Sequence, residues 1–150
     1  MKKYFEYEFN EKIKEKLLKY YDSVESIDDF GDGNKKTALK LDRINDYINY
    51  NPNDCILDVG CADGILLKYL SGRYKNGVGL DISKKVIDAD TELRLPNVVF
   101  ETYDGSHITY TEKFDKVFLM DVLEHSFEPD ILLQSIYTCL KKKRGGYKHS

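Results

Sequence analysis

The 150-residue sequence lacks the features of several protein classes. Its apolar runs are far shorter than the roughly 20 residues of a membrane-spanning helix, and glutamates interrupt the stretch where a signal peptide would be apolar. Its three cysteines, Cys55, Cys61 and Cys139, have no CxxC spacing, so neither a disulfide framework nor a zinc site is indicated. A net charge of −3 gives no general attraction to nucleic acid. We therefore expect a cytoplasmic protein with no membrane or nucleic-acid partner.

The N-terminal third of the chain is expected to be helical. Ile13 and Leu17 recur at helical spacing among the lysines and glutamates of residues 10–21, which predicts an amphipathic helix. The acidic stretch 22–34 contains two glycines and predicts a polar loop. A second helix should end near residues 51–54, where proline and asparagine break the pattern. Its apolar stripe consists of Ala38, Leu41, Ile44, Tyr47 and Ile48.

From Cys55 onward, short apolar segments alternate with helical patterns, which predicts an α/β domain with a parallel sheet. The four expected strands are residues 55–59, 77–80, 97–101 and 114–121, and their short apolar runs suit strands that are covered on both faces. Helices should fill the gaps, with Ser83 as the N-cap of one and Pro129 in the first turn of the last. The residues of this last helix expected to face the core are Ile131, Leu132, Ser135, Ile136 and Leu140.

A turn containing two glycines joins the first strand to its helix, with the sequence Asp-Val-Gly-Cys-Ala-Asp-Gly at residues 58–64. Open α/β sheets bind ligands at the carboxyl ends of their strands, and Gly60 and Gly64 would let the backbone turn tightly against a ligand. Asp81 ends the second strand, where an acid can accept both ribose hydroxyls of a nucleoside. The alternatives are an ordinary tight turn and a helix-capping Asp81. Together, the two features favour an adenosine ligand.

The residues of the turn also discriminate among adenosine ligands. From Gly60 the chain reads Gly-Cys-Ala-Asp-Gly-Ile, which misplaces two of the three small residues of the dinucleotide fingerprint. Asp58 and Asp63 would repel a pyrophosphate, whereas the sulfonium and ammonium groups of S-adenosylmethionine tolerate carboxylates. No Gly-Lys-Ser or Gly-Lys-Thr follows the turn, which excludes a Walker phosphate loop. An NAD or nucleotide-sugar enzyme is therefore a distant alternative.

Three segments, residues 56–64, 78–83 and 114–125, resemble successive motifs of class I S-adenosylmethionine-dependent methyltransferases, in the small-molecule and quinone-type branch. The resemblance covers residues 36–146. It implies a Rossmann-like sheet of about four parallel strands in the order 3-2-1-4, with helices on both faces and two N-terminal helices before it. It also divides the chain into residues 1–34, a helix and acidic loop on the acceptor side, and residues 35–150, the S-adenosylmethionine-binding domain.

The resemblance implies which residues bind the cofactor. Asp81 would hold the ribose, and Ile82 would pack on the adenine. Asp104, with Gly105 beside it, resembles the acid that contacts the adenine amino group, although a turn former is the alternative. Met120 matches the end of the fourth strand, which faces the methionine end of the cofactor and the acceptor. The residues of the turn assigned to the methionine part are Asp58, Gly60, Cys61 and Gly64.

Catalytic residues are not identified by the sequence, in which His125 and Asp121 are only weak candidates. Some relatives use Glu-x-x-Glu-His to bind a metal, but here Asp121 is one methylene shorter and no second histidine is near, so we expect no metal. A structural role for Asp121, Glu124 and His125 is favoured over general base catalysis, because attack on a sulfonium needs mainly proximity and orientation. His107 and His149 are expected to be surface residues.

The resemblance changes after Gly146, where class I methyltransferases continue with three more strands. We therefore expect a domain that is truncated at its C-terminus and leaves the edge of the fourth strand open, through which copies could associate. Two functions are compatible with the sequence. One is an S-adenosylmethionine-dependent methyltransferase acting on a small-molecule acceptor, and the other is a catalytically incompetent cofactor-binding fragment or partner subunit.

Overall fold

The computed structural model of the 150-residue chain describes residues 33–142. The helix expected at residues 10–21, most of the acidic loop and His149 lie outside the described residues. None of the helices within residues 33–142 has the length and apolar character needed to span a bilayer.

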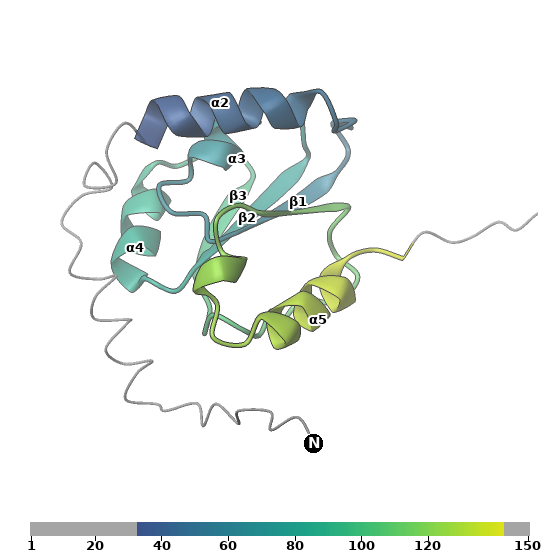
Figure 1. Ribbon diagram of the computed structural model, residues 1–150. Helices are drawn as coiled ribbons and strands as arrows, with labels where there is room; N and C mark the ends of the chain where they lie inside the picture. The colour runs from purple at the N-terminus through teal and green to yellow at the C-terminus, as the bar shows by residue number, and fades with distance from the viewer. Residues whose placement is uncertain (1–32, 143–150) are drawn as a thin grey trace, which may run out of the picture.

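A four-stranded parallel sheet forms the centre of the domain (Figure 1). Its strands are β1 (Cys55–Val59), β2 (Asn76–Asp81), β3 (Val98–Thr102) and β4 (Lys116–Leu119), in the spatial order β3-β2-β1-β4. The predicted fold class and strand order are confirmed. Because all four strands are parallel, their carboxyl ends meet at one edge of the sheet, where α/β folds bind ligands.

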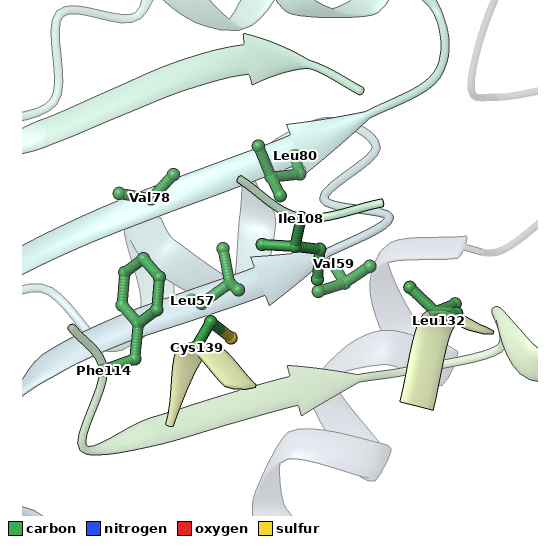
Figure 2. Packing of buried hydrophobic residues seen from close by; sticks show 8 residues of the cluster. All are labelled: Leu57, Val59, Val78, Leu80, Ile108, Phe114, Leu132 and Cys139. Carbon is green, nitrogen blue, oxygen red and sulfur yellow. The ribbon is translucent and has the colours of Figure 1, made fainter. Parts of the chain in front are cut away.

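Helices cover both faces of the sheet, as the strand composition predicts. On one face, Leu57 and Val59 of β1 and their neighbours in β2 pack against residues of α5 (Pro129–Cys139), in the cluster shown in Figure 2. On the other face, Ile56 of β1 and Phe118 of β4 pack against α2 (Gly33–Asn45) and α3 (Ile65–Tyr69). Alternate residues of β1 therefore enter two separate cores.

The helices begin where the sequence predicts. Ser83 caps α4 (Lys84–Glu92) by accepting a hydrogen bond from the amide of Val86 at 3.3 Å, and Pro129 is in the first turn of α5. The inward face of α5 differs from the prediction. Ile131 is 38% exposed, whereas Leu132 and Cys139 are fully buried, so the helix is rotated toward a face that includes the cysteine.

Two other predicted boundaries are corrected. The strand expected at residues 114–121 is confined to Lys116–Leu119, because Phe114 forms only an isolated bridge with Leu140 and Asp121 has a positive φ of 54°. The second helix ends at Asn45, so Tyr47 lies beyond it and is 89% exposed instead of facing the core.

Polar contacts fix the end of α2 against α3. The amide of Asn45 donates to the hydroxyl of Tyr69 at 2.8 Å, and Tyr50 donates to Asn45 at 2.9 Å. The guanidinium of Arg73 lies 5.3 Å from the centre of the Tyr50 ring, a favourable cation–π distance. These contacts hold α2 in place, and α2 in turn brings Lys40 to the carboxyl edge of the sheet.

Candidate functional site

The turn after β1 lies at the carboxyl edge of the sheet and is fixed to β2. The amides of Gly60 and Cys61 both donate to the carbonyl of Leu80, at 2.7 and 2.9 Å. Gly60 has a φ of +73°, and a Cβ on it would lie 2.5 Å from the side chain of Val122. Gly64 also has a positive φ, of +67°. Both glycines are therefore required by the backbone path, and the turn packs closely against the segment after β4.

Asp81 connects this turn to the start of α4. Its Oδ2 accepts a hydrogen bond from the amide of Ala62 at 3.1 Å, and its Oδ1 accepts one from the amide of Ser83 at 3.0 Å. Ser83 supplies the side-chain cap of α4, so Asp81 is not the cap itself. Since a carboxylate has about four acceptor positions, these two amides alone do not saturate the Asp81 carboxylate.

Asp58 is a buried carboxyl group beneath the turn, with only 3% of its surface exposed. Burial, with a smaller contribution from the nearby carboxylates of Asp81, Asp90 and Asp63, raises the pKa of Asp58 to about 8. None of the hydrogen bonds among residues 33–142 ends on the Asp58 carboxyl group. A cation bound beside the Asp58 carboxyl group would stabilise its ionised form and lower its pKa.

The residues assigned to the adenine are brought together. A Cβ on Gly105 would lie 3.5 Å from the side chain of Ile82, so the loop after β3 approaches the end of β2. Asp104 accepts hydrogen bonds from the amides of Ser106 and His107, at 2.8 and 2.7 Å. Asp104 thus has the turn-forming role that was the alternative to adenine binding, and its contact with adenine stays a prediction.

His107 is exposed, as expected, but it has a partner. Its Nδ1 lies 2.8 Å from Oδ2 of Asp104. Burial acts to raise the pKa of Asp104, but the hydrogen bonds from His107 and Ser106 outweigh it, so that the pKa is below its ordinary value. Asp104 is therefore a stable anion at the edge of the site.

The segment after β4 forms the opposite side of the site. Met120 is half-buried against the core of α2 and α3, and the exposed Asp121 forms an ion pair with Lys40 of α2. Glu124 and His125 are exposed in the short 3-10 helix Leu123–His125. In the part of the chain that the structure describes, no group of three or more His, Cys, Asp or Glu could hold a metal ion. Base catalysis by Asp121 or His125 stays untested.

Three features of this edge are not predicted by the sequence. Asp90 of α4 is buried, with 3% of its surface exposed, and receives a hydrogen bond from the thiol of Cys61. Lys40 reaches Asp121 across 81 positions of sequence. The hydroxyl oxygen of Ser126 is buried with no hydrogen-bond partner among the described residues. In the sequence, Asp90 reads as one more acid of an amphipathic helix, and no local signal indicates the positions of Lys40 or Ser126.

Comparison with known proteins supports the family resemblance. A family model described as a methyltransferase domain matches residues 10–147. The ubiquinone biosynthesis O-methyltransferase of Glaesserella parasuis is 32% identical over 113 residues, which are 69% of this chain and 48% of the relative. This chain therefore spans about half the length of the curated relatives that it matches.

Solved structures share the fold. The DhpI–SAH complex superposes with a TM-score of 0.70 at 21% identity, covering 87% of this chain and 65% of DhpI. The cyclase SpnF has a TM-score of 0.61 at 24% identity, covering 69% of this chain and 40% of SpnF. The match to the family model extends over nearly the whole chain, and the sheet has the order expected for it. The chain belongs to the class I S-adenosylmethionine-dependent methyltransferase family.

Proposed function

We propose that this domain binds S-adenosylmethionine and takes part in methyl transfer to an oxygen, nitrogen or carbon of a small-molecule acceptor. The observation that carries the proposal is the buried Asp58 carboxyl group with the carboxylates of Asp81 and Asp63 near it, at the turn where the sheet of this family holds its ligand. These acidic groups favour a cationic ligand over a pyrophosphate. S-adenosylmethionine supplies two positive groups, a sulfonium and an ammonium.

The residues present fit the cofactor. Asp58 is a buried acid without a hydrogen-bond donor among residues 33–142, at the turn itself. Asp81 would accept the ribose hydroxyls while keeping its bonds to the amides of Ala62 and Ser83. Ile82 and the loop at Gly105, which lie close to each other, would border the adenine. We assign the methionine part to the side of the turn that faces Met120.

The chemistry that the cofactor supplies is an activated methyl group on a sulfonium. The protein's contribution to such a displacement is mainly to hold the donor in line with the acceptor. The turn does this through its two amide bonds to Leu80, and the acidic interior favours the charged donor over its neutral product. We assign no general base, because Asp121 is paired with Lys40 and His125 is exposed.

A second candidate function is cofactor binding without methyl transfer. It is supported by SpnF, which is named as a cyclase and has the same fold, because a fold by itself does not determine the reaction.

The two candidates share a first test, which is titration calorimetry with S-adenosylmethionine. We expect Asp81→Ala to abolish binding, while Asp88→Ala, an exposed acid two residues before Asp90 on α4, leaves the affinity unchanged. Asp81→Ala also removes the hydrogen bond from the amide of Ala62, so a loss of binding could come from a displaced turn. A 2′-deoxy analogue of S-adenosylhomocysteine provides the control, because it removes a ribose hydroxyl and leaves the protein unchanged. Wild type should prefer the ribose form, and Asp81→Asn should reduce that preference. No binding by wild type would refute the proposal.

Turnover separates the candidates. Methyl transfer from labelled cofactor to any small acceptor by the purified chain would support the enzyme, and cofactor binding with no transfer would support the second candidate.

We further propose a cytoplasmic location, based on the three unpaired cysteines. Self-association through the edge of β4, which ends the sheet, is also proposed, and sedimentation velocity at rising concentration would detect it.

A further inference from the structure

Asp90 is the buried acid that the proposed function leaves unused. It lies on α4, whose other acids Asp88 and Glu92 are exposed, yet only 3% of its own surface is accessible. A carboxylate is rarely buried unless a specific contact holds it. Its position toward the interior therefore requires an explanation in terms of what it contacts.

The contact is with the turn. The Sγ of Cys61 lies 3.6 Å from Oδ2 of Asp90, with the thiol donating and the carboxylate accepting. Burial raises the pKa of the Cys61 thiol far above its usual range, with Asp58, Asp81 and Asp90 adding to the effect. The raised pKa favours the protonated thiol, which is the donor in this bond.

Cys61 is held from several directions at once. Its amide donates to the carbonyl of Leu80 at 2.9 Å, and its own carbonyl accepts from the amide of Gly64 at 2.9 Å. On the side of β2, a Cβ on Gly79 would lie 3.0 Å from Sγ, so the strand leaves space for the sulfur. The backbone of Cys61 is thus bonded to β2 and within the turn. The bond from its thiol to Asp90 connects its side chain to α4.

We propose that Asp90 is a positioning residue for the cofactor turn, acting through Cys61 to hold residues 60–64 against α4. The inference rests on the proposed function, since it assumes that this turn holds the cofactor. Asp90 does not need to touch the cofactor in order to act. Its effect should therefore depend on the presence of the thiol and be independent of the charge of the ligand.

The test is a double-mutant cycle with Asp90→Ala and Cys61→Ala, measured as dissociation constants for S-adenosylmethionine and S-adenosylhomocysteine. Each single substitution should weaken binding roughly threefold to tenfold, the value of one hydrogen bond, and by the same factor for both ligands. In the Cys61→Ala background, Asp90→Ala should have almost no further effect. Asp90→Asn keeps an acceptor for the thiol and should restore most of the affinity, and Asp88→Asn is the control for charge.

Three outcomes would overturn the proposal. Additive effects in the cycle would show that Asp90 does not act through Cys61. A loss confined to S-adenosylmethionine would show direct electrostatic recognition of the sulfonium, and an unchanged affinity in a folded Asp90→Ala protein would show no role. If Asp90→Ala does not fold, Cys61→Ala and Asp90→Asn still test the contact from its two sides.

Hydrogen exchange makes the inference independent of cofactor binding. Loss of the Asp90 contact should speed exchange at the amides of Gly60, Cys61 and Gly64, which form the bonds of the turn. If wild type binds neither ligand but Asp90→Ala still loosens the turn, the proposed function fails and the positioning of the turn stands. If exchange in the turn is unchanged, the inference fails whatever the cofactor does.

Discussion

Replacement of Asp58 by asparagine should change how the stability of the protein depends on pH. Burial, together with Asp81, Asp90 and Asp63, raises the pKa of Asp58 from 3.8 to about 8 in the folded protein. A raised pKa means that the folded state binds the proton more tightly than the unfolded state. The stabilisation is therefore fully present below pH 3.8 and is lost as the pH rises to about 8.

The size of the effect follows from the proton linkage. Between pH ~5 and pH ~7 the unfolded Asp58 is ionised and the folded one is protonated, so each pH unit removes about 1.4 kcal/mol from the free energy of unfolding. Over these two units the wild type should lose about 3 kcal/mol that Asp58→Asn does not lose. Any difference between the two proteins that is independent of pH cancels in this comparison.

Urea unfolding at a series of pH values measures the difference directly, because the free energy in water is obtained at each pH from a linear extrapolation. Asp88→Asn, which removes an exposed acid from α4, is the matched control and should follow the wild type. Parallel curves for wild type and Asp58→Asn would refute the reasoning, since they would mean that Asp58 is already ionised in the folded protein.

Two further substitutions test the geometry of the carboxyl edge. Gly60→Ala should destabilise the protein by roughly 1–3 kcal/mol, because its φ of +73° is strained for alanine. Adding Val122→Ala should restore only the part of this loss that is due to the 2.5 Å contact between the new Cβ and Val122. If thermal melts show full restoration of stability, the positive φ makes no contribution. Lys40→Ala should change stability by less than about 1 kcal/mol, because the side chains of the ion pair with Asp121 are 47% and 63% exposed, and a larger loss would show that the pair holds α2 in place.

The strands and the turn could be predicted because their signals are local. Each strand is a short apolar run, and β1 appears at the predicted bounds of residues 55–59. Gly60 and Gly64 occupy positions of positive φ, which is what a glycine in a strand-to-helix turn indicates. The parallel arrangement then places the end of each strand at the same edge, so Asp58, Asp81 and Met120 are brought to one region by topology.

The features that could not be predicted depend on contacts between distant parts of the chain. Asp90 reads as a solvated acid on an amphipathic helix, and only the packing of α4 against the turn shows that it is buried. The sequence predicts that Ile131 faces the core, whereas in the structure Cys139 is buried and Ile131 is exposed. A broad apolar stripe does not fix the rotation of a helix about its axis precisely enough to separate these two positions. The early end of β4 likewise reflects the backbone of Asp121, whose φ is positive without a glycine.

Binding of the cofactor should offset the loss of stability that rising pH causes in the ligand-free protein. At about 100 times its dissociation constant, a ligand that binds only the folded state adds about 2.7 kcal/mol to the free energy of unfolding. A cationic ligand favours the ionised form of Asp58, so it should release a proton on binding and bind more tightly as the pH approaches 8. At a fixed concentration of S-adenosylmethionine, the gain in stability should therefore grow with pH, while the ligand-free protein becomes less stable over the same range.

Asp58→Asn provides the control, because without a titrating group the stabilisation by the cofactor should lose most of its pH dependence. S-adenosylhomocysteine, which keeps the ammonium group but lacks the sulfonium charge, should stabilise the wild type with a weaker dependence on pH. Thermal shifts measured at fixed ligand concentration and several pH values distinguish these cases. If the cofactor stabilises wild type and Asp58→Asn with the same pH dependence, then the buried carboxyl group is not coupled to the positive charge of the cofactor, and its burial must instead serve the packing of the turn.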